Sequence, residues 1–590
     1  MAKPCLILDD AAQGHAWAFA RPIDTIRAEV AEEVPAALAA MEAARTAGRH
    51  VAGYFSYELG YALEPRLAGL MPRARAVPLL WFGIFDVPEA MEGPALETAL
   101  DSWREGRSYA GPLEHEWSEA AYRTRFDRVR DLIAAGDLYQ ANLSFRSRFA
   151  FAGDPLALYR SLRAQSAARY GAYVDDGERH ILSLSPELFF EISADGNIIA
   201  RPMKGTAARE PGSAADARAR EDLAASPKDR AENLMIVDLL RNDLGRIAEI
   251  GSVGVSDLFA VETYPTLHQM VSTVFAKLTP GATVQSVVRA LFPCGSVTGT
   301  PKIRAMEVIA ELEKGPRGVY CGAIGHFGPE GSARFNVAIR TLTITGDRGE
   351  LGIGGAVVQD SVAAGEYAEC LLKARYYEAA RRPLELIETL KFSPDNGFVR
   401  ADLHLARMVR SAAAFGIAFD RESALRALND APAEAMTDLR VRLTLDERGK
   451  FTCTVVPLGP ASATWTYAIS PLLVSSLDVL ARHKTNWRDL YDREYARLTK
   501  AFGCNEVLFL NERGKVVEGS RTNVFIARGG KLLTPPLSAG ALDGCLRRAL
   551  MDEGRCVETT LLPDDLTGDV YLGNSLRGLI RAVLTVDLNK

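Results

Sequence analysis

The sequence predicts an α/β fold divided into two domains, and three observations lead to this prediction. The chain has 590 residues, which is too long for one hydrophobic core at roughly 100–200 residues per domain. Helical and strand-like patterns alternate through the first 375 residues. A predicted helix then ends at Arg381-Arg382-Pro383, because proline cannot continue a helix. We therefore expect one domain over residues 1–380, with its core at 120–375, and a second over 384–590.

The elements expected in each domain follow from periodicity. An alanine-rich stretch predicts a helix over 32–47, and alternating side chains predict a strand over 137–148. Apolar residues at helical spacing predict a helix over 231–244, and another is expected over 366–380. The second domain begins with an expected strand at 384–392 and a turn at 393–397. Segments rich in valine, isoleucine and glycine predict strands at 51–57, 319–327, 335–345 and 350–358.

Composition and charge exclude several classes of protein. The chain is 48% hydrophobic and 24% charged, which is typical of a globular protein and not of a disordered one. A net charge of −6 argues against nucleic acid as a partner. No segment approaches the ~18 apolar residues of a membrane helix, and no secretory signal precedes the first strand. Eight scattered cysteines without a Cys-x-x-Cys pair indicate reduced thiols and a cytoplasmic enzyme.

A lysine and two acidic pairs are the first candidates for chemistry. Lys204 follows an expected strand and precedes Gly205; it is either a solvated surface charge or, in a dry site, a nucleophile or base. Asp229 with Glu232, and Glu366 with Glu369, are spaced i, i+3 on expected helices, and Lys373 follows one turn later. Two such faces would form an oxygen-rich site for Mg²⁺ if they met; separately, each would be an ordinary solvated helix face.

Two glycine-rich segments are candidates for binding a small anion. Residues 295–302 read Gly-Ser-Val-Thr-Gly-Thr-Pro-Lys, whose spacing is wrong for a Walker motif and whose Pro301 lacks a backbone amide donor. Together with the glycines at 352–355, this segment indicates close approach of the backbone to an anion. Arg340, at the end of an expected strand, could clamp a carboxylate with two hydrogen bonds.

Seven motifs occur in an order that resembles the chorismate-utilising enzymes, which include anthranilate, isochorismate, salicylate and aminodeoxychorismate synthases. The resemblance is strong over 120–375 and weak over 50–120. It implies a layered α/β fold and Mg²⁺ held by Glu232 and Glu369, supported by Asp229 and Glu366. It also implies chorismate contacts from Tyr320, Arg340, Gly354 and Lys373, and further active-site positions at Ser296 and His268. The motifs are Ser185–Glu187, Arg201–Thr206, Lys228–Asn233, Val237–Gly245, Gly295–Lys302, Tyr320–Gly325 and Gly365–Glu369.

The residue types at two positions distinguish the members of this family from one another. Relatives that add water have a lysine where Gln140 stands, so glutamine there implies ammonia as the nucleophile. Anthranilate synthases have a small unreactive residue where Lys204 stands, and lysine marks the aminodeoxychorismate synthases. By this resemblance, Lys204 attacks C2 of the ring, Glu187 is the general acid for the departing 4-hydroxyl, and ammonia then adds at C4. The alternative is an anthranilate synthase component I fused to an aminotransferase.

The source of ammonia is expected to be a second protein. A class I glutaminase needs a Gly-x-Cys-x-Gly elbow and a His-x-Glu pair, and none of the eight histidines is followed by x-Glu. We therefore expect a separate glutamine amidotransferase subunit to supply ammonia. The Leu-Leu-Glu-Ser motif of feedback-regulated relatives is absent, so we expect no inhibition by tryptophan.

The second domain holds one residue for each need of a pyridoxal phosphate site. Such a site requires a Schiff-base lysine, an acid at the pyridinium nitrogen, and an arginine with backbone amides for the phosphate. Lys484, Glu518, Arg407 and the amides of Cys545 and Leu546 are the candidates. Each residue taken singly is more often structural than functional.

This set resembles the fold-type IV pyridoxal phosphate enzymes from Leu384 to about Leu579, with Ser575 at a phosphate-contacting position. The usual N-terminal stretch of that family, with Asp-Arg-Gly and Tyr-Gly-Asp-Gly, is missing here. The resemblance implies that Lys484 removes the C4 proton and that pyruvate is lost to give 4-aminobenzoate. A transaminase could use the same residues, but fusion to an aminodeoxychorismate synthase favours a lyase. The resemblance also allows a homodimer through this domain. We expect a bifunctional enzyme of folate synthesis.

Overall fold

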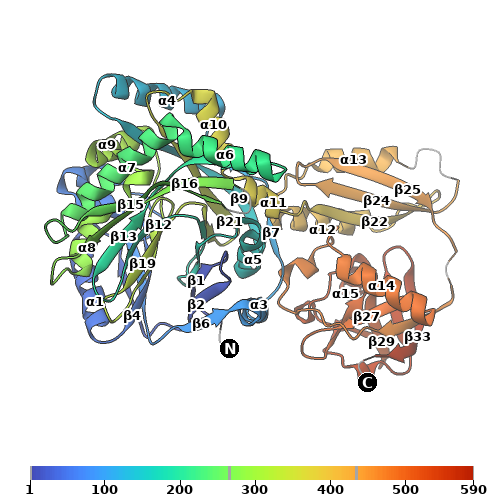
Figure 1. The fold of residues 1–590 in the computed structure, drawn as a ribbon. Coiled ribbons are helices and arrows are strands. Elements are labelled where there is room, and N and C mark those ends of the chain that lie inside the picture. The colour runs from blue at the N-terminus through green and yellow to red at the C-terminus, as the bar shows by residue number, and fades with distance from the viewer. Residues whose placement is uncertain (1–2, 264–266, 432–435, 461, 589–590) are drawn as a thin grey trace. The chain divides into compact units, whose positions relative to one another are not determined.

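The computed structural model describes residues 3–263, 267–431, 436–460 and 462–588, which form two compact units (Figure 1). The first unit contains residues up to Trp103, Leu113–Phe149 and Tyr159–Ala380. The second contains Arg381 onward together with two short earlier segments, Arg104–Pro112 and Ala150–Leu158. Helices and strands alternate through both units, which confirms the predicted α/β class.

The first unit is built on two large antiparallel sheets. In one, the order of the described strands is β17 (Gly299–Thr300), β9 (Gln140–Gly153), β21 (Arg348–Val357), β20 (Thr341–Thr345), β11 (His180–Ser185), β10 (Tyr170–Asp175), β1 (Leu6–Asp10), β2 (His15–Phe19) and β6 (Glu89–Glu92), while β8 (Glu114–His115) also pairs with β9. The last residues of β9 belong to the second unit and pair there with β7 (Ser108–Ala110). In the other, it is β14 (Met203–Ala208), β16 (Leu267–Lys277), β13 (Asn197–Arg201), β12 (Leu188–Ile192), β19 (Ala333–Val337), β18 (Ala323–Phe327), β4 (His50–Phe55), β5 (Leu80–Phe85) and β3 (Asp24–Ala28), with β15 (Gly254–Thr263) paired to β16.

Two hydrophobic clusters explain why this unit is layered. One cluster joins side chains from both sheets, such as Leu6 and Ile181 from the first and Tyr54 and Ile324 from the second, so the sheets pack face to face. The other lies between the second sheet and the helices that cover it, among them α1, α7 and α8 (Figure 1). The layered fold implied by the family resemblance is therefore confirmed.

The helices of the first unit connect and cover these strands. Ser226 caps α7 by accepting a hydrogen bond from the Asp229 amide at 3.3 Å, and Pro227 occupies its first position, where proline is favoured. The helices are α1 (Val34–Thr46), α2 (Leu59–Leu63), α3 (Gly93–Ser102), α4 (Glu119–Ala134), α5 (Pro155–Ser166), α6 (Ser213–Ala225), α7 (Pro227–Gly245), α8 (Val284–Leu291), α9 (Lys302–Leu312), α10 (Ala363–Leu372) and α11 (Arg375–Ala380), with 3₁₀ turns η1 (Ala31–Glu33), η2 (Pro65–Leu70) and η3 (Gly295–Val297).

The second unit has two sheets of its own. The smaller has the order β23 (Gly397–Phe398), β22 (Glu385–Ser393), β24 (Leu439–Asp446) and β25 (Phe451–Pro457), with α12 (Ala401–Ala414) and α13 (Arg421–Asp430) packed on it. The larger has the order β28 (Val516–Gly519), β27 (Glu506–Leu510), β26 (Thr464–Ile469), β33 (Gly578–Asp587), β32 (Val570–Asn574), β29 (Asn523–Arg528), β30 (Lys531–Thr534) and β31 (Cys556–Glu558). The remaining elements are η4 (Val479–Arg482), α14 (Asp489–Phe502), η5 (Leu537–Ala539), α15 (Cys545–Asp552) and η6 (Pro563–Asp565).

Several element boundaries differ from the sequence prediction. The helix expected over 366–380 is two helices, α10 and α11, separated at Lys373 and Ala374. The strand expected over 335–345 is interrupted because Arg340 adopts a left-handed φ of 50°. Only the second half of 319–327 is a strand, and Cys321 before it has a φ of 63°. Leu234, expected on the apolar face of its helix, is 43% exposed.

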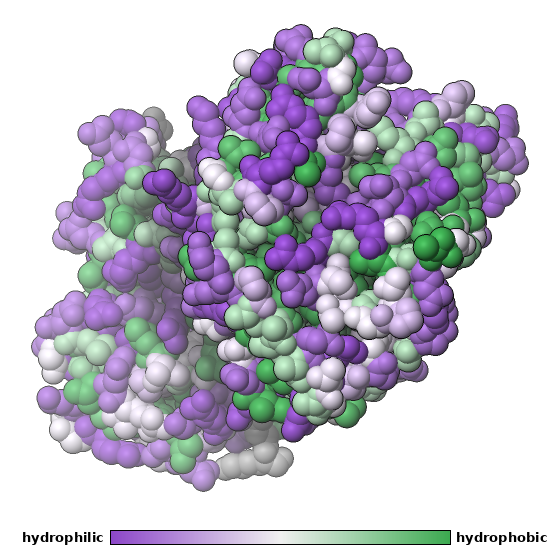
Figure 2. All heavy atoms as spheres, turned by 90° about the vertical axis from the view of Figure 1, so that its left-hand side faces the viewer, coloured by the Kyte–Doolittle hydropathy of each residue, from purple (hydrophilic) through white to green (hydrophobic). Residues whose placement is uncertain are grey.

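Hydrophilic and apolar side chains are mixed on the face of the molecule drawn in Figure 2. In the described ranges, no helix has the length and apolar character needed to span a bilayer. All eight cysteines have free thiols.

Candidate active sites

A carboxyl group and an amine in the first unit influence each other's charge and have pKa values shifted in opposite directions. Glu187, just before β12, is 4% exposed. Burial raises its pKa to about 7, against the effect of a hydrogen bond from Ser296, the charge of Lys204 and a bond from the Met203 amide. Lys204, on β14, has its pKa lowered by burial, and the Lys373 charge adds to this effect, while Glu232, Glu187 and Glu369 oppose it. Both shifts favour the uncharged form of the group, which is the protonated carboxyl of Glu187 and the neutral amine of Lys204.

The acidic residues of α7 and α10 act on the same lysine. Burial raises the pKa of Glu232, and the charges of Asp229 and Glu366 contribute to this rise. Burial likewise raises the pKa of Glu366, which also accepts a hydrogen bond from Ser361 at 2.7 Å. The pKa of Glu369 is lowered despite its burial, because Lys373 lies 3.0 Å from its carboxylate. The two helix faces thus share one electrostatic site.

Asp229 lies directly against the backbone that carries Lys204. A Cβ on Gly205 would approach the Asp229 Cβ to 2.8 Å, and Gly205 has a φ of 84°. Only glycine fits this position without displacing one of the two segments. This close packing holds β14 against α7 and thereby fixes the position of Lys204 relative to the acidic residues of α7.

Two glycines of β21, Gly352 and Gly354, allow close approach of neighbouring residues on one face of the strand. A Cβ on Gly352 would lie 2.2 Å from Cγ of Tyr320, and one on Gly354 would lie 2.5 Å from the Ser144 hydroxyl. The Tyr320 hydroxyl forms a hydrogen bond with Ser144. Lys373 Nζ donates to the Gly354 carbonyl at 2.9 Å, so this carbonyl ties the strand to the end of α10.

Gln140 is a buried polar residue without partners. Its side chain is 0% exposed, and neither its amide nitrogen nor its amide oxygen has a hydrogen-bond partner among the described residues. A buried amide with both atoms unpaired costs free energy, which a polar ligand would recover. Ser296, on η3, is also buried, and its hydroxyl lies 3.2 Å from the Cys294 thiol.

Three other residues highlighted by the sequence have local partners. His268, on β16, has both ring nitrogens engaged, by Thr263 at 3.0 Å and Asp216 at 2.9 Å. Arg340 lies in the turn between β19 and β20, where its charge acts on the buried Tyr376 hydroxyl. Lys302, the last residue of the glycine-rich segment, forms a buried ion pair with Asp243 at 2.6 Å, so this lysine is part of the scaffold.

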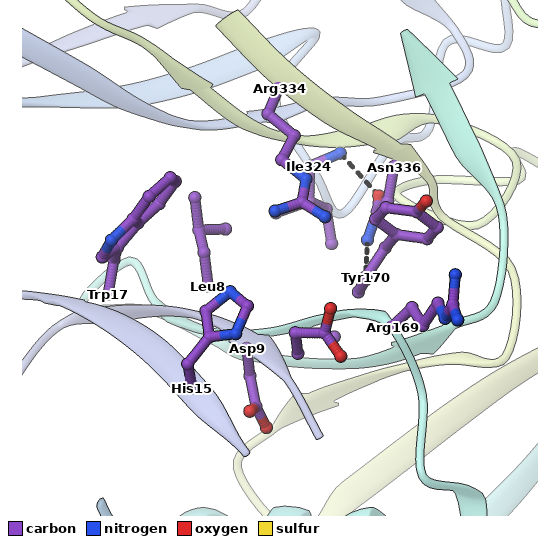
Figure 3. A pocket seen from close by; sticks show the side chains of 11 residues that line it. Leu8, Asp9, His15, Trp17, Arg169, Tyr170, Ile324, Arg334 and Asn336 are labelled. Carbon is purple, nitrogen blue, oxygen red and sulfur yellow. Dashed lines mark hydrogen bonds between the residues drawn. The ribbon is translucent and has the colours of Figure 1, made fainter. Parts of the chain in front are cut away.

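Two of the cavities formed by the described residues of the first unit bear on the site. One is lined by Ser144, Tyr320, Glu313 and Arg317, next to the β21 glycines. The other opens between the two sheets and is shown in Figure 3, where Asn336 donates to the Tyr170 carbonyl at 2.8 Å. Its lining combines aromatic and charged side chains, among them Asp9, His15, Trp17, Arg169 and Arg334.

Lys484, in the second unit, lies among charged residues. Lys484 follows η4, and its carbonyl accepts a hydrogen bond from the Ile387 amide at 2.8 Å. Burial lowers the pKa of Lys484 to about 8, assisted by the charges of Arg407 and Arg488. A fraction of this amine is therefore neutral near physiological pH, as a nucleophile or base requires.

Glu518 is a buried acid of this unit. It lies on β28 and accepts a hydrogen bond from the Leu542 amide at 2.9 Å. Burial raises its pKa to about 7, opposed by this bond, by the Arg488 charge and by a bond with Tyr491. Such a carboxyl can share a proton with a basic ring nitrogen at neutral pH.

Arg407 is held in place by a carboxylate. Its Nε and Nη2 donate to Glu388 at 2.8 and 2.6 Å, and its Nη1 donates to the Asp543 carbonyl at 3.0 Å. One N–H on each terminal nitrogen stays available for an anion. Cys545 and Leu546 open α15, whose first-turn amides have no acceptor within the helix.

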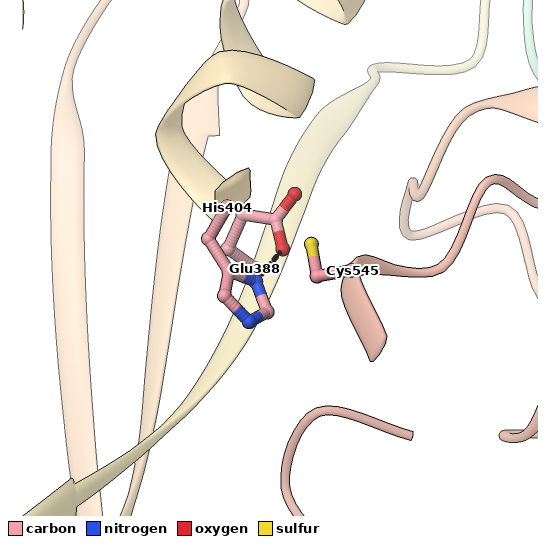
Figure 4. A group of neighbouring side chains, drawn as sticks. All are labelled: Glu388, His404 and Cys545. Carbon is pink, nitrogen blue, oxygen red and sulfur yellow. Dashed lines mark hydrogen bonds and ion pairs between the residues drawn. The ribbon is translucent and has the colours of Figure 1, made fainter. Parts of the chain in front are cut away.

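Glu388, His404 and Cys545 form a compact cluster (Figure 4), with one potential ligand atom of each within 4.8 Å of the others. The cluster is unfavourable for a metal ion. Both Glu388 oxygens are engaged by Arg407 and His404, and Arg407 and Lys484 make the surroundings positive. His404 Nε2 instead lies 2.9 Å from the hydroxyl of Ser575.

Glu388 and His404 were not among the candidate residues predicted from the sequence. His404 and Arg407 are three residues apart on α12 and point the same way, toward Glu388 on β22. That spacing is readable in the sequence. The identity of their shared partner is not, because it comes from another element.

Comparisons with known proteins match the two units separately. The family model described as chorismate binding enzyme matches residues 3–378, and the model described as amino-transferase class IV matches residues 385–584. The chain is 39% identical over 337 residues to aminodeoxychorismate synthase component 1 of Klebsiella aerogenes, covering 54% of this chain and 74% of that protein. It is 49% identical over 270 residues to aminodeoxychorismate synthase of Streptomyces pristinaespiralis, covering 46% of this chain but only 38% of that protein.

A solved structure agrees with the fold of the first unit. Anthranilate synthase component I from Streptococcus pneumoniae TIGR4 is 25% identical, with a TM-score of 0.53. The match covers 61% of this chain and 91% of that one.

Proposed function

Because this chain belongs to the family of chorismate binding enzymes, we propose that it converts chorismate and ammonia to 4-aminobenzoate and pyruvate. The first unit would form 4-amino-4-deoxychorismate, and the second would eliminate pyruvate from it. The observation that carries the proposal is the pairing of Glu187, whose pKa is raised to about 7, with Lys204, whose pKa is lowered. The raised pKa favours the protonated acid at position 187, and the lowered pKa favours the neutral, nucleophilic amine at position 204.

In the first reaction, neutral Lys204 attacks C2 of chorismate. The ring double bonds shift, and the C4–O bond breaks as Glu187 donates its proton to the departing hydroxyl, which leaves as water. Ammonia then forms a bond to C4, the double bonds shift back, and the Lys204 amine is expelled from C2. The net reaction consumes chorismate and ammonia and releases 4-amino-4-deoxychorismate and water.

Gln140 supports ammonia rather than water as the nucleophile. A glutamine amide has no basic group that could deprotonate water. Its buried and unpaired amide could instead hydrogen-bond ammonia or the ring substituent that ammonia replaces.

The carboxylates of α7 and α10 have the chemistry of a magnesium site. Glu232 and Glu369, with Asp229 and Glu366 beside them, supply the oxygen ligands that Mg²⁺ prefers. The charges of Asp229 and Glu366 raise the pKa of Glu232, which is a repulsion that a bound cation would relieve. Mg²⁺, when bound, would neutralise the carboxylates of chorismate. Our candidates for contacts to the substrate are Arg340, Tyr320, Lys373, the Gly354 backbone, Ser296 and His268.

The residues of the second unit fit pyridoxal phosphate. Arg407 and the first amides of α15, at Cys545 and Leu546, would bind the phosphate, with the Ser575 hydroxyl beside them. Glu518 would hold a proton at the ring nitrogen. The cofactor, when bound, supplies an electron sink for the developing carbanion. Lys484 would remove the C4 proton, and the enolpyruvyl side chain would then leave as pyruvate while the ring becomes aromatic.

Ammonia would reach the first unit from a separate glutamine amidotransferase, as the name component 1 of the Klebsiella relative suggests. We also infer that the chain works in the cytoplasm, because its eight thiols are free. Its product would serve folate synthesis. The second unit would pair with the second unit of another copy. The purified chain should use ammonium but not glutamine. A glutamine-dependent rate without a second protein would contradict the need for that partner.

The decisive assay supplies chorismate, Mg²⁺, ammonium and pyridoxal phosphate to the purified chain. We expect 4-aminobenzoate, distinguished from 2-aminobenzoate by its fluorescence. Lys204→Ala should lower the rate about 10³-fold. Lys277→Ala, which changes a lysine whose side chain binds the Asp195 carbonyl, should leave it unchanged. Formation of 2-aminobenzoate would instead establish the alternative, an anthranilate synthase fused to an aminotransferase.

A further inference from the structure

A buried chain of hydrogen bonds in the second unit joins a carboxylate, an imidazole and a hydroxyl. Glu388 Oε2 lies 2.5 Å from His404 Nδ1, and His404 Nε2 lies 2.9 Å from Ser575 Oγ. The three residues are 1%, 1% and 8% exposed. They come from β22, from α12 and from the turn that follows β32. Figure 4 shows the first two, with the imidazole directed at the carboxylate.

The partners of Glu388 fix the tautomer of His404. Burial alone would raise the pKa of Glu388, but Arg407 and the bond with His404 hold it at about 2. An ionised carboxylate only accepts hydrogen bonds, so His404 Nδ1 must carry a proton and donate it. In the neutral ring, Nε2 then has no proton and accepts the one on Ser575. The single proton of the Ser575 hydroxyl is therefore committed to His404.

This arrangement cannot bind an anion through Ser575 as it stands. A hydroxyl whose proton points to His404 presents only lone pairs elsewhere, and these repel a phosphate oxygen. Turning the hydroxyl away would leave His404 Nε2 buried without a partner, which is costly. A second proton on the imidazole removes the conflict, because Nε2–H then donates to Ser575 Oγ and frees the serine proton for the anion.

We propose that His404 takes up a proton at Nε2 when the phosphate of the cofactor binds, and thereby turns the Ser575 hydroxyl toward that phosphate. The inference rests on the proposed function, since the anion is the phosphate of pyridoxal phosphate. The proton comes from solvent, and no covalent bond between heavy atoms changes. His404 is a positioning residue, and Glu388 orients its ring and balances its charge.

The groups around His404 set the direction of the pH effect. Burial lowers the pKa of His404, and Arg407 on the same helix and Lys484 add to this, while Glu388 on β22 opposes it. Cys545 opens α15, with its thiol pKa raised by burial to about 11, so it is uncharged. Arg400 donates to the Ser575 carbonyl at 3.5 Å. A phosphate dianion would raise the pKa of His404. Binding of the phosphate therefore becomes weaker as the pH rises through the interval between the pKa values of the free and the bound protein.

The test compares two ligands that differ only in the phosphate. Pyridoxal phosphate and pyridoxal are titrated into the full chain from pH 7 to 9, where the ester is mainly a dianion, and binding is followed by absorbance. The ratio of the two dissociation constants isolates the phosphate contribution. We expect this preference to fall severalfold across the range in the unmodified protein. In His404→Gln it should be about tenfold lower at pH 7 and independent of pH.

Variants at both ends of the pair separate positioning from folding. Ser575→Ala should lose the same pH dependence, and adding His404→Gln to it should cost no further preference. The matched control is His115→Gln in the first unit, where His115 Nδ1 lies 2.8 Å from the Ser147 hydroxyl in a similar pair. This control should retain the full pH dependence.

Calorimetry gives an independent readout. Titrations in buffers of different ionisation enthalpy should show that the unmodified chain takes up more protons on binding pyridoxal phosphate than His404→Gln does. Equal proton uptake and equal pH dependence in the two proteins would overturn the proposal and leave the proposed function intact. Absence of pyridoxal phosphate binding by the unmodified chain would overturn both.

Discussion

At the scale of single residues, burial sets the chemistry of Glu187. Its carboxyl has a pKa raised to about 7 by burial, and it acts as an acid only when protonated. The rate of chorismate consumption at saturating ammonium should therefore fall as the pH rises through about 7. In Glu187→Gln the residual rate should be at least 10²-fold lower and lack this decline. A steady-state pH profile measures both, and an unchanged profile in the variant would assign the proton to another group.

The same carboxyl should destabilise the folded protein at high pH. Its pKa in the folded state is raised above the ordinary value of 4.5 to about 7, so the folded state binds the proton more tightly than the unfolded state. The contribution of this one group to stability is then largest below pH 4.5, falls between about 4.5 and 7, and is lower by about 3 kcal/mol above that range. We expect Glu187→Gln to raise the melting temperature at pH 8 and to change it little at pH 4.5. A melting temperature that Glu187→Gln lowers at pH 8 would instead mean that the buried carboxylate is stabilised by a charged partner.

Lys302 illustrates how a motif residue can be structural. Its Nζ contacts Asp243 at 2.6 Å and the Leu291 carbonyl at 2.9 Å, and both side chains of the pair are largely buried. Lys302→Met leaves a buried carboxylate unpaired and should destabilise the first unit by about 3–5 kcal/mol. Adding Asp243→Asn should recover much of the loss. Thermal denaturation of the three variants tests this, and equal stability of Lys302→Met and the unmodified chain would refute it.

At the scale of elements, the shape of β21 follows from its glycines. A strand places alternate residues on one face, so Gly352 and Gly354 share a face while Gly355 turns toward Glu366 and Lys373. A methyl group on Gly352 would meet the base of the Tyr320 ring at 2.2 Å, which a rotation of the ring cannot relieve. Gly352→Ala should therefore raise the KM for chorismate at least tenfold. Gly69→Ala, where a Cβ would meet nothing within 4 Å, should change it less than twofold.

Element boundaries show where local patterns were insufficient. The strand expected at 137–148 is β9, Gln140–Gly153, and its first six residues are buried on both faces, so alternation of polarity did not reflect exposure there. The helix expected at 366–380 is divided after Leu372, where Lys373 bonds to the Gly354 carbonyl of β21. Contacts with other elements are present at both places, since both faces of β9 are covered and Lys373 is bonded to β21.

At the scale of the whole molecule, each of the two units would perform one step of the proposed pathway. We expect Lys484→Ala to accumulate 4-amino-4-deoxychorismate and to consume chorismate within twofold of the normal rate. Lys204→Ala should still release pyruvate and 4-aminobenzoate when it is given that intermediate. Chromatography of the products measures both. Loss of chorismate consumption in Lys484→Ala would show that the steps are not independent.

The sequence by itself determined the α/β class, the order of the two units and the residue types available for chemistry, because periodicity and motif spacing are local properties of the chain. It also indicated Lys204, Glu187, Lys484 and Glu518 as candidates for catalysis, and their roles stay predictions. Only the tertiary structure decided that Lys302 pairs with Asp243, and that His404 forms hydrogen bonds with both Glu388 and Ser575. Such partners lie on separate elements and are far apart in the sequence. They meet because burial and hydrogen bonding favour that arrangement in the folded chain, and a local sequence pattern contains no information about it.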